Sequence, residues 1–226
     1  NIFTGSDIND RDASAYRATF VYDAGGRLTA TLSAQYYEED DNNYAFSYFG
    51  QSEGSSIPVP FGVPILGGNT VGMVGGGFYD INSDQEPIND RDGQLINLTI
   101  DYAFNDRWSL KSITSSQSMD RFLRDDLDST DANLFGQNNY TEESDSFGQE
   151  LILNYSADRL DVLGGVMYFE EDLYGEVRVP LTNICFLLAP AACGTPVGEF
   201  LNGGNYLQDG DVDIEAWGAY VEANYS

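Results

Sequence analysis

The period of two in the hydrophobic pattern constrains the fold of this chain more than any other feature of its sequence. Along residues 16–22, Tyr, Ala, Phe and Tyr fall on one side, whereas Arg, Thr and Val fall on the other. After a Gly-Gly turn the alternation resumes over residues 28–36, and it then returns over 96–104, 108–113, 147–155, 160–168 and 213–225. A period of two is typical of β-strands with two unlike faces. We therefore predict an all-β fold of seven antiparallel strands that follow one another in sequence order.

Short and long connections alternate between these segments. Tight turns fall near residues 25, 106 and 158, whereas long segments at about 39–90, 125–144 and 179–211 join the other strand ends. A soluble β-sandwich rarely has a connection of about fifty residues without elements of its own. Short turns at one end and long loops at the other are usual in membrane barrels. The pattern favours an antiparallel transmembrane β-barrel segment of about seven up-and-down strands, with short periplasmic turns and long extracellular loops.

Aromatic residues support this interpretation by their position near the strand ends, with Ala, Leu, Ile and Val between them. They are Tyr16, Tyr22, Tyr36, Tyr102, Phe104, Trp108, Tyr155 and Tyr168. Aromatic side chains gather in girdles at the two membrane interfaces of such barrels. The hydrophobic pattern of a single strand is the same in a soluble β-sandwich and in a membrane barrel. The position of the aromatic residues is what favours the barrel.

Composition excludes several classes of function. The 226 residues hold 10 Lys and Arg against 37 Asp and Glu, a net charge of −27 that repels nucleic acid. The chain has no histidine, which removes Ser-His-Asp and Cys-His nucleophiles as well as histidine-bound zinc and haem. Glu170 and Glu171 are adjacent and point to opposite faces of a strand, so they do not form a glycosidase pair. We expect no enzymatic activity and no catalytic cofactor.

Three segments carry a resemblance to a known family. They are residues 112–122 (SITSSQSMDRF), residues 146–151 (SFGQEL) and residues 162–171 (VLGGVMYFEE). Together they resemble the middle of the barrel of TonB-dependent outer-membrane receptors, in which Phe-x-Gln-Glu-Leu and Gly-x-x-Tyr-Phe strands recur. The resemblance covers about residues 13–226.

The resemblance implies that residues 1–226 are part of such a barrel, with the plug domain and the remaining strands absent, since seven strands do not close a barrel of about 22. It also implies the outer membrane of a Gram-negative bacterium, contact with lipid, and uptake of a small molecule or metal chelate driven by TonB through the absent plug. The ligand would be a ferric siderophore first, then cobalamin or an oligosaccharide. Two alternatives remain open, namely an outer-membrane porin without a plug and a secreted, acidic, calcium-binding β domain.

Candidate binding residues lie in the long connections. Asp125, Asp126, Asp128 and Asp131 offer clustered oxygens for a structural calcium ion, although the segment lacks the glycine and distal glutamate of an EF-hand. A solvated acidic face is the alternative interpretation. Tyr44, Phe46, Tyr48 and Phe49 are candidates for ligand contact at the outer mouth, or for packing of the loop onto its neighbours.

Cys185 and Cys193 are the two cysteines of the chain, and both fall in the last long connection. Because this side of an outer-membrane barrel is not kept reduced, we predict that they form a disulfide. The bridge would limit the freedom of the loop more than it stabilises the barrel, since it closes a short segment.

Overall fold

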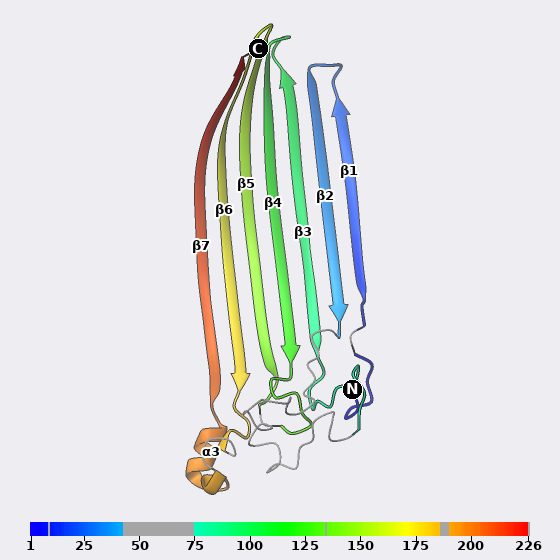
Figure 1. The fold of residues 1–226 in the computed structure, drawn as a ribbon, viewed down its shortest axis with the longest axis vertical. Coiled ribbons are helices and arrows are strands. Elements are labelled where there is room, and N and C mark those ends of the chain that lie inside the picture. The colour runs from blue at the N-terminus through cyan, green and yellow to red at the C-terminus, as the bar shows by residue number, and fades with distance from the viewer. Residues whose placement is uncertain (9, 43–74, 134, 186–189, 226) are drawn as a thin grey trace.

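The seven alternating segments form seven β-strands in the computed structural model, and the strands lie side by side in a single sheet (Figure 1). The structure describes residues 1–8, 10–42, 75–133, 135–185 and 190–225. The strands are β1 (Ala13–Asp23), β2 (Leu28–Asp41), β3 (Ile88–Ala103), β4 (Trp108–Asp125), β5 (Asn138–Ala157), β6 (Leu160–Pro180) and β7 (Asn205–Tyr225). Each strand pairs antiparallel with the next one in the chain, which confirms the predicted up-and-down order.

Tight turns join the strands at one end of the sheet. Between β1 and β2, the Asp23 carboxylate accepts hydrogen bonds from the backbone N–H groups of Gly25 and Gly26, at 2.9 and 3.2 Å. Both glycines have positive φ angles, 80° and 92°, a region that only glycine enters without strain. The Asn105 side chain caps the turn between β3 and β4 in the same way. Figure 1 shows these turns with the C-terminus at one end, and the N-terminus with the long connections at the other.

The strands run further toward the long connections than the sequence pattern indicates. β2 continues to Asp41, β5 begins at Asn138 and β7 begins at Asn205. The long connections predicted at about 39–90, 125–144 and 179–211 are therefore too long. The reason is that each further pair of residues adds backbone hydrogen bonds to an existing ladder. Charged side chains that alternate between the two faces do not interrupt such a ladder.

The two faces of the sheet differ in composition. Residues directly opposite one another share a face, so a row can be followed from strand to strand through the register. One row holds Ala30, Ile100, Ser112, Leu151, Val166 and Ala219, and we call this side the apolar face. A row on the other side, the polar face, holds Thr19, Ser33, Asn97, Ser115, Gly148, Phe169 and Ala216.

Among the described residues, the buried apolar side chains all lie at the end of the sheet with the long connections. They are Ile81, Leu123, Ala132, Val179, Ile184 and Cys185. On the apolar face, by contrast, Phe20 is 66% exposed, Val221 75% and Trp217 79%. Within the described residues no second layer packs on this face. Exposed apolar surface costs about 25 cal/mol per Å² in water, so a cover on this face would be stabilising.

Helical structure is minor in the described ranges. The 3₁₀-helix η1 (Pro190–Ala192) and the α-helix α3 (Pro196–Asn202) both lie between β6 and β7. None of the helices in the described part of the chain has the length and apolar character needed to span a membrane.

A tyrosine packed closely across a glycine gives a first prediction. Tyr37 crosses Gly93 on the polar face, and a Cβ atom added at Gly93 would lie 2.6 Å from the Tyr37 hydroxyl oxygen and 2.8 Å from the Ser118 carbonyl oxygen. We expect Gly93→Ala to lower the free energy of unfolding by about 1–3 kcal/mol. Denaturant unfolding followed by tryptophan fluorescence measures the change. Gly175→Ala is the matched control, because its Cβ atom would meet nothing within 4 Å. Equal losses in the two variants would contradict this account.

Candidate functional site

Aromatic pairs mark the two ends of an apolar belt on the apolar face. Near the short turns, the Trp108 and Tyr155 rings lie 4.7 Å apart. Farther along the strands, the Tyr168 and Trp217 rings lie 4.5 Å apart. Between the two pairs the face carries mainly Leu, Ile, Val and Ala. On β7 the two pairs lie at the levels of Trp217 and Ala223, which are about 20 Å apart at a rise of about 3.3 Å per residue. The alternation continues to the aromatic Tyr225, so that residues 217–225 extend about 26 Å.

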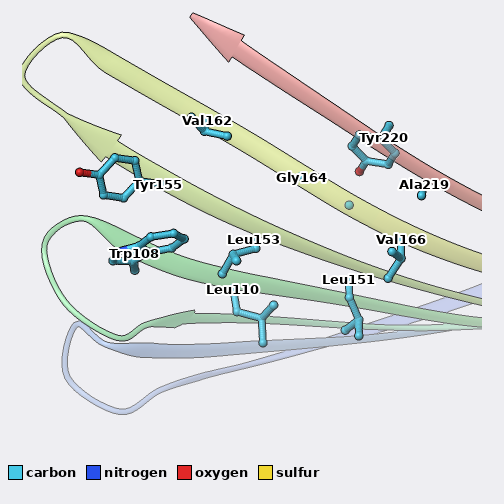
Figure 2. Close-up of a pocket in the computed structure, with 11 residues that line it drawn as sticks. Trp108, Leu110, Leu151, Leu153, Tyr155, Val162, Gly164, Val166, Ala219 and Tyr220 are labelled. Carbon is cyan, nitrogen blue, oxygen red and sulfur yellow. The ribbon is translucent and has the colours of Figure 1, made fainter.

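A shallow groove of about 590 Å³ lies within this belt (Figure 2). Leu110, Leu151 and Leu153 line it from β4 and β5, and Gly164 leaves its floor open on β6. Trp108 and Tyr155 stand at the end nearest the short turns. The lining is almost entirely hydrocarbon. The groove therefore offers a surface that an apolar partner can cover rather than groups that could perform bond chemistry.

Between the belt and the long connections, the apolar face becomes acidic. Asp145, Asp172 and Asp213 lie directly opposite one another on β5, β6 and β7. The next row holds Glu38, Asp92, Asp120 and Glu143 on β2 to β5. Like charges directly opposite one another destabilise a sheet unless water screens them. This half of the face is therefore suited to water and the belt is not.

The polar face carries a row of opposite charges at the same height. Across the seven strands it consists of Ala13, Glu39, Arg91, Arg121, Glu142, Gly175 and Gly210, and we call it the arginine row. Arg91 Nη2 lies 2.7 Å from Glu39 Oε2, and Arg121 Nη1 lies 3.8 Å from Glu142 Oε2. The sequence pattern did not identify this row, because its members come together only through the register of six strand pairs.

Asp125 is the last residue of β4, and Asp126 and Asp128 lie in the connection to β5; all three are buried. Asp126 Oδ1 accepts hydrogen bonds from the N–H groups of Asp128 and Ser129, each at 3.1 Å. Asp128 Oδ1 accepts from the Thr130 hydroxyl at 2.5 Å. Asp125 Oδ1 accepts from the Asn138 amide at 2.5 Å. These carboxylates thus serve as acceptors that shape the loop.

Burial above all, together with the charges of Asp128 and Asp84, raises the pKa of Asp126 to about 7, although hydrogen bonds from Ser83 and Ser129 lower it. Burial likewise raises the pKa of Asp128 to about 6, with a contribution from Asp84, although hydrogen bonds from Thr130 and Phe135 lower it. Burial also raises the pKa of Asp125. The loop therefore holds several carboxylates that resist ionisation together.

The structure brings Asp126 and Asp128 close to Asp84, which the sequence pattern did not include. In the described ranges, no three acidic or cysteine side chains form a group that could hold a metal ion. Calcium binding by Asp125, Asp126, Asp128 and Asp131 stays a prediction. The predicted contact residues Tyr44, Phe46, Tyr48 and Phe49 lie outside the described residues.

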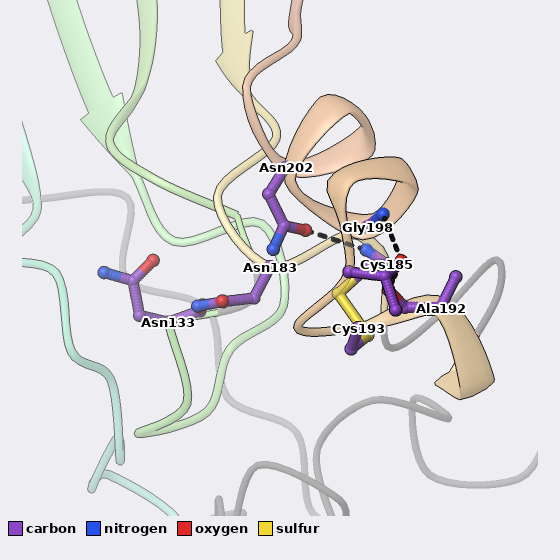
Figure 3. Close-up of a disulfide and its surroundings, with 8 residues drawn as sticks. Asn133, Asn183, Cys185, Ala192, Cys193, Gly198 and Asn202 are labelled. Carbon is purple, nitrogen blue, oxygen red and sulfur yellow. Dashed lines mark hydrogen bonds between the residues drawn. A yellow bond between two sulfur atoms is a disulfide. The ribbon is translucent and has the colours of Figure 1, made fainter.

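Cys185 and Cys193 are joined in a disulfide, with Cα atoms 5.6 Å apart (Figure 3). The Asn202 side chain at the end of α3 accepts a hydrogen bond from the Cys185 N–H at 2.9 Å. Thr195 caps this helix, with Pro196 in its first turn. The Thr-Pro pair was a readable helix signal that the sequence analysis missed. Val197 and Phe200 on α3 are 62% and 83% exposed.

Comparisons with known proteins show a likeness in fold. No family model matches the chain, and no curated protein matches it. Among solved structures, the siderophore receptor PiuA from Acinetobacter baumannii is similar in fold, with a TM-score of 0.54 and 13% sequence identity. The match covers 94% of this chain and 32% of the receptor, so the chain spans about a third of that protein's length. At this identity the likeness concerns the fold alone.

The buried carboxylates predict that the loop after β4 is more stable in acid than in base. Because the folded pKa values of Asp126 and Asp128 are raised above the ordinary value, their protonated forms stabilise the loop fully below about pH 4. That stability is lost as the pH rises through about 6 to 7. Hydrogen exchange of residues 126–133 should therefore be slower at pH 5.5 than at pH 8, after correction for the intrinsic rate.

Asp126→Asn keeps the accepting oxygen but removes the charge, so it should slow exchange at pH 8 and flatten the pH dependence. Asp145→Asn is the control, because it removes a carboxylate from an exposed position on β5. If wild-type exchange shows no dependence on pH beyond the intrinsic one, the account of these carboxylates is wrong.

Proposed function

We propose that this chain forms part of the wall of an outer-membrane receptor that captures a scarce ligand, with a ferric siderophore as the first candidate. The observation that carries the proposal is the exposed apolar belt with aromatic pairs at both ends. The fold likeness to a siderophore receptor supports the choice of protein class.

A lipid bilayer has the dimensions that this belt requires. A membrane-spanning β-strand has about 9–11 residues, and the apolar band of such barrels is about 25 Å tall. The nine residues from Trp217 to Tyr225, which run two residues past the level of the Trp108 and Tyr155 pair, meet both values. Hydrocarbon would cover the groove and the exposed leucines. The aromatic rings at the two ends of the belt would lie at the two membrane interfaces. The acidic rows between the belt and the long connections would lie in water.

Closure of the barrel must come from strands other than these seven. β1 and β7 form the two edges of the sheet in the described residues, and unpaired backbone groups cannot face lipid. In the proposed receptor, further strands pair with both edges. The polar face then lines the lumen, and a plug coupled to TonB supplies the energy of transport. This chain contributes a passive wall and the connections that meet the ligand.

A porin without a plug would use the same wall, and the requirement for energy separates the two. A secreted calcium-binding β domain would have acidic connections as well, but it gives no reason for the exposed belt. Association with membranes separates that class from the other two.

Charge placed within the belt should prevent membrane insertion. Ile100 lies on the apolar face within the belt, and Thr99 is the next residue of the same strand on the polar face. We expect Ile100→Arg to cost about 2–4 kcal/mol at the bilayer midplane. Thr99→Arg should be tolerated, because it faces the lumen in the row of Glu150. The fraction of each variant of the native polypeptide that floats with outer membranes in a density gradient measures the effect. If wild-type protein does not float, or both variants float equally well, the membrane assignment fails.

Uptake should depend on energy if the wall belongs to a TonB-coupled receptor. Cells that carry the native protein should accumulate ⁵⁵Fe from a ferric siderophore, and a protonophore or loss of TonB should reduce accumulation at least tenfold. A porin would pass the same chelate at an unchanged rate. Uptake that persists without TonB would therefore replace the receptor proposal with the porin alternative.

A further inference from the structure

Arg91 and Arg121 of the arginine row face each other across β3 and β4. Two like charges in this position destabilise the sheet unless something offsets them. Glu39 lies on the β2 side of the pair and Glu142 on the β5 side, so both glutamates flank the arginines and neither lies between them. Such a pair holds positive charge in one place in a chain of net charge −27.

The Arg91 side chain is oriented by its neighbours, yet one of its hydrogen-bond donors has no partner. Its guanidinium lies 5.5 Å from the centre of the Tyr37 ring, which fixes the plane of the group. Glu39 contacts Arg91 at 2.7 Å and Arg11 at 3.7 Å, so one carboxylate serves two arginines. The Nε atom of Arg91 is buried and has no hydrogen-bond partner. The side chain as a whole is 39% exposed, so the rest of the guanidinium is open to a ligand.

Space for a small molecule lies on both sides of the pair. A cavity of about 370 Å³ is lined by Arg121, Tyr140, Glu142 and Gly175, among others. A second one of about 330 Å³ is lined by Arg11, Tyr37, Glu39 and Arg91. The row ends in Gly175 and Gly210, where an added Cβ atom would meet nothing within 4 Å. The absence of these side chains leaves the floor open beside Glu142, on the side away from Arg121.

We propose that Arg91 and Arg121 form a binding site for a small, soluble oxyanion with two or more carboxylate or phosphate groups. Guanidinium groups present forked N–H donors that match such oxygens in pairs. The inference rests on the proposed function in one respect, namely that the polar face lines the lumen. It implies that the ligand is recognised through negative charge, although the chain as a whole is strongly acidic.

The height of the row favours a solute over a lipid headgroup. Arg91 lies twelve residues before the end of β3, which is about 40 Å from the short turns and beyond the belt. It also lies on the face opposite the belt. A ligand that enters from the side of the long connections would therefore meet the arginine row before it reaches the level of the bilayer.

Equilibrium binding to the full native protein in detergent tests the site, with citrate and pyrophosphate as probes at low ionic strength. The double variant Arg91→Gln and Arg121→Gln should weaken binding at least tenfold. Replacing both arginines by lysine should cause an intermediate loss of affinity, because lysine keeps the positive charge but lacks the forked N–H donors of the guanidinium group. Arg124→Gln is the matched control, since it removes the same charge three residues along β4 on the opposite face. It should change affinity less than twofold.

Three results would overturn the inference: no saturable binding of either probe to the wild type, an unchanged affinity in the double variant, or an equal loss in Arg124→Gln. Near-ultraviolet circular dichroism of each variant verifies that the sheet is intact. Flotation of the same samples keeps the two hypotheses apart. Protein that floats but binds probes without the arginines refutes the site alone, whereas protein that does not float refutes the membrane wall, whatever the probes show.

Discussion

Hydrogen bonding from strand to strand is the constraint on which the rest of this structure depends. The described residues form one sheet with no second layer, so the backbone groups of the inner strands β2 to β6 are satisfied by neighbouring strands. The register of those pairs also decides which side chains share a face, and a slip of one residue would exchange the two faces. The belt, the acidic rows and the arginine row all depend on that register.

Charge and apolar surface are sorted by face and by height together. Near the short turns, the apolar face carries Leu151 and Val166 where the polar face carries Thr99 and Glu150. Toward the long connections, the first face turns acidic and the second carries paired arginines and glutamates. A soluble sandwich would keep each face uniform along the strands, because one side always meets water. In the proposed membrane wall, a change partway along the strand would mark the boundary between lipid and water.

Local signals were readable from the sequence and non-local ones were not. The glycine turn at Gly25 and Gly26 and the Asn105 turn are set by neighbouring residues, and the alternation over 147–155 shows both faces of one strand. The predicted strand ends were misplaced because acidic residues such as Glu38 and Glu143 are typical of loops. In the structure, backbone hydrogen bonds to the neighbouring strand keep these residues in the sheet. Arg91 and Arg121 are thirty residues apart and become neighbours only through the register. The sequence pattern did not lead us to predict helix α3, although Thr195 followed by Pro196 is typical of a helix N-terminus.

The alternation of short and long connections also divides the sheet into modules. β1 with β2, β3 with β4, and β5 with β6 are each closed by a few residues, so each hairpin forms at a small entropic cost. Pairing between hairpins requires closure of a far longer segment. Assembly would then proceed from hairpins to sheet. Because a hairpin is the unit that is added, gain or loss of one would change the circumference of a barrel by two strands while preserving the alternation of its ends.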